Sequence, residues 1–418
     1  MTTALPHRAL VVGLARSGRA AVLVLRRRGV EVVGYDRSAD VDAPELMAAG
    51  AEVVLGGERA DVLDGVDLLV KSPGVPGDAF PVVAARDRGI PVISEIELAV
   101  RLLANPVIGI TGTNGKTTTT ALLGAIFEAA GVQAEVAGNI GRPLTTVVDT
   151  AAAGAWVVCE LSSFQLEDVD SLRPRVAVLL NLEPDHIDRH GSFEAYRAAK
   201  LRIFENQGRD DIAVVPRGFG TIPGSARRIE FSGDDPLPAE PRLPGAHNRE
   251  NAAAAAAAAR AAGVGDDAVA EALRSFPGVE HRIEELATIA GVRYVNDSKA
   301  TNVAAARRAL VSFPDSRLHV ILGGLGKHES YTPLAAAFGP RDRAYLIGAA
   351  AGEIATALDG AGVPYEQCGD LSRALAAATS AAELGDVVLL SPACASYDQF
   401  SSYERRGEEF GRLVQKLQ

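Results

Sequence analysis

The segment from Gly109 to Thr120 has the residues of a phosphate-binding loop, in the order G-I-T-G-T-N-G-K-T-T-T-T. Backbone N–H groups of a glycine-rich turn and of the helix N-terminus that follows it can bind phosphate oxygens. Lys116 can neutralise the terminal phosphates, and the hydroxyl of Thr117 can ligate Mg²⁺. The loop therefore predicts that the chain binds and uses ATP. The ATP-binding residues predicted from the loop are Gly112, Thr113, Asn114, Gly115, Lys116, Thr117 and Thr118.

The glycine spacing differs from the standard pattern G-x-x-x-x-G-K-[ST], which would place a glycine where this chain has Ile110. Gly109 and Gly112 flank that position instead. A glycine-rich turn without a ligand is the alternative interpretation. The buried-strand pattern of 106–110 and the helical pattern of 118–130 favour the phosphate loop, because they place the turn between a strand and a helix N-terminus.

A second set of polar residues follows the loop. Glu160 and the pair Asp185-His186 come directly after strand-like segments, and Lys200 lies in the run A-A-K-L-R. Ligands bind at the carboxyl edge of an open parallel sheet, so a carboxylate and an imidazole there could hold Mg²⁺ beside the triphosphate. Each residue alone has a more ordinary interpretation. Glu160 would be a solvated cap, the histidine a structural residue and Lys200 a lysine on a helix surface.

The elements that must position these residues alternate between apolar strands and helical stretches. Such alternation predicts an α/β fold with parallel sheets and helices on both faces. The predicted strands are 9–12, 31–35, 68–70, 107–110, 156–160, 176–181, 292–296, 319–322 and 387–391. More than one sheet is needed to use them all.

A length of 418 residues predicts several domains. We expect a Rossmann-like domain over 1–92, a central ATP-binding domain of P-loop type over 93–278, and a Rossmann-like domain over 279–418. The first domain opens with a βαβ unit whose turn reads G-L-A-R-S-G, with Ala15 at the second glycine of the dinucleotide fingerprint. This replacement weakens a prediction of NAD binding but allows a phosphate or uridine group, with Asp36 placed to accept a hydrogen bond.

The composition excludes several classes of partner. A formal charge of −11 argues against a nucleic-acid surface. No apolar run approaches the roughly 20 residues that span a bilayer, so no membrane partner is expected. The three cysteines show no metal-ligand spacing, which favours a reduced cytoplasmic protein with small core cysteines.

Further motifs complete the pattern: N-R-E-N at 248–251, H-R at 281–282, N-D-S-K-A-T-N at 296–302, S-P-G at 72–74, S-E-I-E-L at 94–98, E-L-S-S-F-Q-L-E at 160–167 and S-P-A-C-A-S-Y-D-Q-F at 391–400. With the phosphate loop, they resemble the Mur ligases, which make amide bonds in peptidoglycan precursors. The resemblance covers nearly the whole chain. It is greatest to the type that adds glutamate to UDP-N-acetylmuramoyl-L-alanine.

The resemblance implies that the first domain binds the UDP substrate and that the third domain binds glutamate. It also implies roles for individual residues. The UDP substrate would contact Arg16, Ser17, Asp36, Arg37, Ser72, Gly74 and Asn139. ATP would also contact Asn251, Arg282 and Asp297. The carboxylates of D-glutamate would contact Thr301, Lys327, Ser396 and Tyr403. Two Mg²⁺ ions are implied, the first held by Thr117 and Glu160 and the second by His186 and Lys200, where Lys200 is carbamylated in relatives.

The same resemblance implies the reaction. The substrate carboxylate would attack the γ-phosphate of ATP and give an acyl phosphate, which the glutamate amine then captures. Lys116, His186 and Lys200 are the expected catalytic residues. His186 is one candidate for accepting the amine proton, although a metal role competes with that. We expect a monomer in which the third domain closes over the other two before chemistry.

Three alternatives stay open. Another ligase of the family could add L-alanine, a diamino acid, a dipeptide or folate glutamates, but the G-L-A-R-S-G and S-P-G motifs favour glutamate addition, and the Asp-Asn-Pro-Arg motif of diamino-acid adders is missing from the sequence. An NAD-dependent oxidoreductase would leave the phosphate loop unused. A nucleotide-gated regulator would hold ATP without spending it. The residues alone also leave open which glutamate enantiomer is used.

Overall fold

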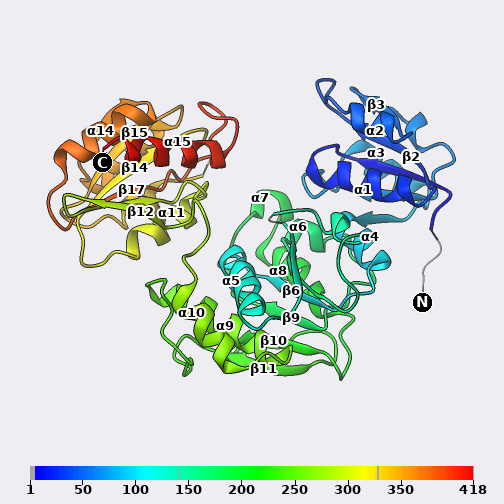
Figure 1. Cartoon of the computed structure of the whole chain (residues 1–418). Helices are drawn as coiled ribbons and strands as arrows, with labels where there is room; N and C mark the ends of the chain where they lie inside the picture. Colours follow the sequence, from blue (N-terminus) through cyan, green and yellow to red (C-terminus); the bar gives the residue numbers. More distant parts are fainter. Residues whose placement is uncertain (1–4, 140, 327–328, 418) are drawn as a thin grey trace. The chain divides into compact units, whose positions relative to one another are not determined.

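The computed structural model describes residues 5–139, 141–326 and 329–417. The chain forms two compact units, residues 1–276 and 277–418. Two sheets lie in the first unit and one in the second (Figure 1). The α/β fold class is therefore confirmed. The three sheets are consistent with three domains, but the boundaries at 92/93 and 278/279 stay predictions, and the strand that closes the first sheet extends to Ser94.

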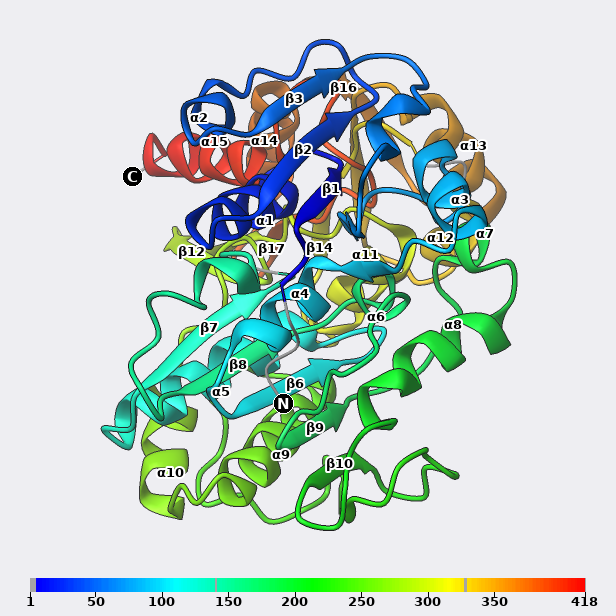
Figure 2. The same cartoon turned by 90° about the vertical axis from the view of Figure 1, so that its right-hand side faces the viewer.

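The first sheet is parallel, with the strand order β3-β2-β1-β4-β5. Figure 2 shows β1, β2 and β3 side by side. The strands are β1 (Arg8–Val12), β2 (Glu31–Asp36), β3 (Glu52–Leu55), β4 (Leu68–Lys71) and β5 (Val92–Ser94). The helices are α1 (Arg16–Arg27), α2 (Pro44–Ala48), η1 (Asp61–Leu63), α3 (Phe80–Asp87) and α4 (Glu95–Leu102).

Both faces of this sheet are buried, as a parallel sheet requires. Ala9 and Val11 of β1 pack with α1, α2 and α4 on one face, whereas Leu10 and Val12 pack with η1 and α3 on the other. The predicted βαβ unit of residues 10–36 is confirmed by β1, α1 and β2.

The second sheet is also parallel, with the order β11-β10-β9-β6-β8-β7. Its strands are β6 (Val107–Thr111), β7 (Ala134–Gly138), β8 (Trp156–Glu160), β9 (Val176–Leu179), β10 (Ile212–Pro216) and β11 (Arg227–Phe231). Its helices are α5 (Lys116–Ala129), η2 (Leu144–Thr146), α6 (Ser163–Leu166), α7 (Ile187–His190), α8 (Phe193–Leu201), η3 (Arg202–Phe204), α9 (Ala246–Ala261) and α10 (Asp266–Ser275). The alanine-rich run at 252–259 lies inside α9, whose small side chains pack closely against α5.

The third sheet corrects one prediction, because it is mixed and not parallel. Its order is β12-β13-β17-β14-β15-β16, and β12 pairs antiparallel with β13. The turn between these two strands consists of Ala290 (φ 49°) and Gly291 (φ 77°). Two residues with positive φ form the tight turn whose twist suits a β-hairpin, so the chain reverses here without a crossover helix.

The remaining strands of the third sheet are parallel. Its strands are β12 (Glu284–Ile289), β13 (Val292–Asn296), β14 (Leu318–Gly323), β15 (Arg343–Ile347), β16 (Tyr365–Gly369) and β17 (Val387–Leu390). Its helices are α11 (Val303–Val311), α12 (Thr332–Ala335), α13 (Ala351–Ala361), α14 (Leu371–Ala381) and α15 (Tyr403–Gln415). Helices α11, α12 and α13 cover one face and α14 and α15 the other.

Two expectations from the composition can be compared with the structure. Cys159, Cys368 and Cys394 are buried free thiols, as predicted for core residues. Within the described ranges, no helix is long and apolar enough to cross a membrane.

Candidate functional site

The predicted phosphate loop is the turn between β6 and α5, which confirms the strand–turn–helix context. Gly112 (φ 153°) and Gly115 (φ 81°) have backbone conformations that favour glycine. A Cβ on Gly115 would lie 2.1 Å from Oδ1 of Asn251 on α9. The loop thus needs glycine at 115 both for its φ angle and for space. Asn251, a predicted ATP residue, is buried beside the loop.

The loop is braced by the residues that follow β9. The amides of Thr113 and Asn114 donate to the carbonyl oxygen of Asn181 (3.0 Å) and to its side-chain Oδ1 (2.9 Å). The Thr113 hydroxyl lies 2.9 Å from the hydroxyl of Tyr196 on α8. Burial raises the pKa of Tyr196, so this hydroxyl stays neutral. The sequence analysis missed Tyr196, and its place in A-Y-R-A-A-K gives no signal beyond an apolar helix position.

The structure does not support the ordinary interpretation of Lys200, since Lys200 is not a surface lysine. Its side chain is buried, and its Nζ donates to the carbonyl of Gly112 at 2.8 Å. Lys116 Nζ donates to the same oxygen at 2.8 Å and to the carbonyl of Thr113 at 2.9 Å. Burial, together with the nearby charge of Lys116, lowers the pKa of Lys200 well below its ordinary value, while Asp185 and Glu160 oppose this shift. The structure therefore brings Lys116, Lys200, Asp185 and Glu160 into one electrostatic neighbourhood.

Glu160 ends β8 at the carboxyl edge of the second sheet, where the sequence predicted a ligand site. The residue is 1% exposed. Its Oε1 accepts a hydrogen bond from Asn139 Nδ2 at 2.8 Å, whereas its Oε2 is buried with no hydrogen-bond partner among the described residues. A hard cation such as Mg²⁺ prefers oxygen ligands and would supply the partner that this buried carboxylate oxygen lacks. Thr117, at the start of α5, is also buried.

His186 lies on a neighbouring segment. It precedes α7 with φ 52°, and its exposed ring packs against the ring of Phe164 with centroids 4.7 Å apart. Among the residues that the structure describes, no group of three or more His, Cys, Asp or Glu side chains is arranged to hold a metal ion. A metal here would need Thr117, Lys200 and ligand oxygens in addition to Glu160 and His186.

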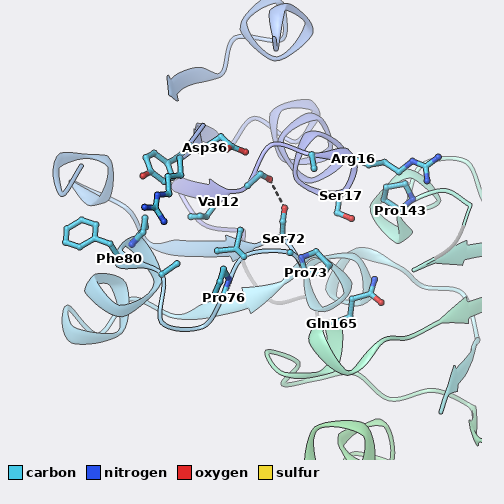
Figure 3. Close-up of a pocket in the computed structure, with 18 of the residues that line it drawn as sticks. Val12, Arg16, Ser17, Asp36, Ser72, Pro73, Pro76, Phe80, Pro143 and Gln165 are labelled. Carbon is cyan, nitrogen blue, oxygen red and sulfur yellow. Dashed lines mark hydrogen bonds between the residues drawn. The ribbon is translucent and has the colours of Figure 1, made fainter. Parts of the chain in front are cut away.

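A cavity of about 680 Å³ lies where the first and second sheets meet in the first unit. All the residues predicted to contact a UDP group line it: Arg16, Ser17, Asp36, Arg37, Ser72, Gly74 and Asn139. In Figure 3, Arg16, Ser17 and Asp36 come from the first βαβ unit, and Ser72 and Pro73 come from the turn after β4. Pro143 directly precedes η2, and Gln165 lies in α6. Tyr35 and Phe80 add apolar walls that the sequence analysis did not single out.

Two of these residues also hold the cavity wall. The Ser72 hydroxyl donates to the carbonyl of Gly13 at 2.7 Å, the dashed bond in Figure 3. Asp36 accepts from the amides of Leu14 (2.7 Å) and Ser38 (2.9 Å). The Asp36 carboxylate thus orders the turn after β1, and it retains lone pairs for a ligand.

The second unit carries the other predicted residues. Asp297, after β13, is buried and accepts from the Ser391 hydroxyl at 2.7 Å. Burial raises its pKa to about 7, although Ser391, Arg282 and Arg406 act in the opposite direction. Ser396 is buried, whereas Thr301 and Tyr403 are half-buried. Lys327 lies outside the described residues.

Arg406, on α15, is a buried cation that the sequence analysis missed. Its guanidinium donates to the Ser298 hydroxyl (3.0 Å) and carbonyl (2.9 Å) and to the carbonyls of Cys394 (3.1 Å) and Ala395 (3.3 Å). It therefore fixes the segments that carry Asp297 and Ser396. An arginine in an amphipathic helix normally faces solvent, so the sequence holds no signal for this role.

Comparison with known proteins agrees with these features. Family models match residues 7–94 (Mur ligase MurD-like, N-terminal domain), 110–220 (Mur ligase middle domain) and 281–394 (Mur ligase, glutamate ligase domain). The chain is 46% identical to UDP-N-acetylmuramoylalanine--D-glutamate ligase of Acidobacterium capsulatum, over 97% of this chain and 95% of that protein. It is 45% identical to the protein of the same name in Anaeromyxobacter dehalogenans, over 97% of each.

Solved structures share the fold at lower identity. UDP-N-acetylmuramate-alanine ligase of Thermotoga maritima superposes with a TM-score of 0.61 at 20% identity, over 99% of this chain and 100% of that one. A bifunctional folylpolyglutamate synthase/dihydrofolate synthase of Yersinia pestis gives 0.56 at 20% identity, over 77% and 92%. On the family models and the curated relatives, the chain belongs to the Mur ligase family of ligases.

Proposed function

We propose that the chain joins D-glutamate to UDP-N-acetylmuramoyl-L-alanine in an ATP-dependent step of peptidoglycan precursor synthesis. The observation that carries this proposal is the cavity lined by all seven predicted UDP-contacting residues, linked through Asn139 to Glu160 beside the phosphate loop. The names of the two relatives at 46% and 45% identity, UDP-N-acetylmuramoylalanine--D-glutamate ligase, support the same reaction.

The reaction requires activation because a carboxylate is a poor electrophile. The L-alanyl carboxylate oxygen would attack the γ-phosphorus of ATP, and the bond to the ADP oxygen would break. The glutamate amine would then attack the carbonyl carbon of the acyl phosphate. Phosphate leaves, and the amine loses a proton. Lys116, at the N-terminus of α5, would exchange its carbonyl partners for phosphate oxygens.

Mg²⁺ fits the residues beside the loop. Thr117 and Glu160 would hold one ion, since Oε2 of Glu160 is buried without a hydrogen-bond partner in the described chain. His186 and Lys200 would serve a second. Bound Mg²⁺ offsets negative charge on the phosphoryl group during transfer.

We further propose that Lys200 is carbamylated. Carbamylation needs a neutral amine, which attacks CO₂ to form an N–C bond and releases a proton. The buried position of Lys200 and its lowered pKa both favour the neutral amine. The product is an anionic oxygen group, which can ligate metal where an ammonium cannot.

The second unit would bind the glutamate carboxylates through Thr301, Lys327, Ser396 and Tyr403. Arg282 and Asp297 would contribute to ATP binding. The buried Nε of Arg282 has no hydrogen-bond partner among residues described in the structure, which suits an arginine that binds an anion.

A product assay tests the proposal. ADP release should require UDP-N-acetylmuramoyl-L-alanine, Mg²⁺ and D-glutamate, and oxygen-18 from the substrate carboxyl should appear in inorganic phosphate. Lys116→Ala should abolish ADP release, whereas the control Lys416→Ala, at an exposed position after α15, should not. Equal rates with L-glutamate, or phosphate without the label, would contradict the proposed reaction.

A further inference from the structure

Lys71 is a buried cation that the proposed mechanism does not use. It ends β4 directly before the turn of residues 72–76, which lines the cavity, and its side chain is 1% exposed. Its Nζ lies 2.8 Å from Oδ2 of Asp168 and 3.1 Å from Oε2 of Glu167. A lysine is rarely buried to this extent unless its charge is compensated, and here two carboxylates compensate it.

The carboxylates extend the contact to a third segment. Oε2 of Glu167 also accepts from Nη2 of Arg189 on α7, at 3.1 Å. The same Nη2 donates to the carbonyl of Val75 at 3.1 Å, and Lys71 Nζ donates to that carbonyl at 3.4 Å. Glu167 and the Val75 carbonyl are therefore each shared by Lys71 and Arg189. We call Lys71, Glu167, Asp168 and Arg189 the ion cluster.

The ion cluster lies between two parts of the candidate site. On one side, Val75 and Gln165 line the cavity, and Gln165 precedes Glu167 by two residues (Figure 3). On the other, the guanidinium of Arg189 lies 4.1 Å from the centre of the Phe164 ring, which packs against His186. The cavity wall and the His186 segment thus depend on the same charged contacts.

We infer that Lys71 is a positioning residue, which holds the cavity turn 72–76 and the His186–His190 segment in one fixed arrangement through Glu167 and Arg189. The inference rests on the proposed function for its effect on turnover, because it takes the cavity as the nucleotide-sugar site and His186 as part of the metal site. The contacts themselves do not depend on that function.

Lys71→Met is the informative variant. Methionine is unbranched and apolar and only one atom shorter than lysine, and the variant leaves Asp168 paired with Arg86 (3.0 Å) and Glu167 paired with Arg189. No buried carboxylate loses its last partner, so the fold should persist. Glu167→Gln is the complementary variant, because it removes the negative charge that pairs with Arg189 while Lys71 keeps Asp168. Arg88→Gln is the matched control. It removes an exposed ion pair with Asp64 at the end of α3, the helix that carries Arg86.

Hydrogen exchange of the free protein tests the link without any ligand. In Lys71→Met, the amides of 72–79 and 186–191 should exchange about tenfold faster or more, as expected for the loss of a buried ionic contact. Glu167→Gln should accelerate 186–191 alone, and Arg88→Gln neither segment. Unchanged exchange in Lys71→Met, or an equal acceleration throughout the first unit, would overturn the inference.

Titration with UDP and steady-state kinetics then test the consequence. Lys71→Met should weaken UDP binding and raise the KM for the nucleotide substrate, each by roughly tenfold, whereas the control keeps wild-type values. A wild-type protein that does not bind UDP would refute the proposed function and leave the exchange result to decide the role of Lys71. Wild-type UDP affinity in Lys71→Met would overturn the inference alone.

Discussion

Replacing Asp297 by asparagine should stabilise the second unit at neutral and alkaline pH. Asp297 is 4% exposed, and burial raises its pKa from 3.8 to about 7. One pKa unit corresponds to about 1.4 kcal/mol, so the ionised carboxylate costs the folded state about 4 kcal/mol relative to the unfolded chain. Asparagine resembles the protonated acid, and its amide can bond to Ser391 and to the amide of Ile283, the two partners of the carboxylate.

The pH dependence of this stability difference follows from the linkage between proton binding and folding. The folded pKa is raised, so the favourable contribution of the protonated carboxyl is complete below pH 3.8 and is lost as the pH rises through about 7. The variant should therefore be only about 1 kcal/mol more stable than the wild type near pH 4.5, and about 4 kcal/mol more stable above pH 8. Since Asp297 is also a predicted ATP contact, the variant should lose activity while it gains stability.

Hydrogen exchange followed by peptide mass spectrometry measures this difference. Peptides from β13 and β17 should exchange at least roughly a hundredfold slower in the variant than in the wild type at about pH 8.5, and by much less at about pH 4.5. Peptides from β6 in the first unit serve as an internal control. Asp315→Asn, the same change at an exposed position, should show no difference. An equal difference at both pH values would refute the reasoning.

Three further outcomes are expected. Glu95→Gln should stabilise the first unit by about 2 kcal/mol above pH 7 and not below pH 4, because burial raises the pKa of Glu95 from 4.5 to about 6. Urea unfolding followed by Trp156 fluorescence measures the free energy of unfolding at each pH. A gain in stability that is independent of pH would contradict the prediction. Gly115→Ala should abolish measurable binding of a nonhydrolysable ATP analogue, because the new Cβ would overlap Asn251; wild-type affinity would show that the turn can move. Wild-type enzyme stripped of CO₂ should regain activity with bicarbonate, whereas Lys200→Met should stay inactive; full activity without CO₂ would rule out a carbamate.

The sequence predicted the position and the structure of the phosphate loop well because the motif is local. A strand, a glycine turn and a helix N-terminus stand in one continuous segment, and each has its own residue pattern. Lys200 could not be placed in this way. The partner of its Nζ is the carbonyl of Gly112, which is 88 residues away in the chain, and nothing in A-A-K-L-R distinguishes Lys200 from an exposed lysine.

The fold, like the site, could be predicted from the sequence only where its determinants are local. Parallel strands were predicted from continuous apolar runs, and they lie within a residue or two of their expected positions. The direction of β12 depends on the turn Ala290-Gly291, and alanine is an uncommon residue at a positive φ angle. The ion cluster of Lys71 was also beyond prediction, since its members are distributed over three segments of the first unit and no spacing connects them.

The contacts of Asn139 explain why the cavity and the phosphate loop should act together. Asn139 lines the cavity, and it donates to Oε1 of Glu160, which leaves Oε2 as the oxygen available to a cation. A nucleotide sugar that engages Asn139 would therefore also affect the orientation of the Glu160 carboxylate, the proposed metal ligand. Acyl phosphates hydrolyse readily, so an enzyme of this type benefits when its phosphoryl-transfer site is completed only after the acceptor has bound. The side-chain amide of Asn139, which contacts both sites, would add such a dependence to the domain closure that we expect.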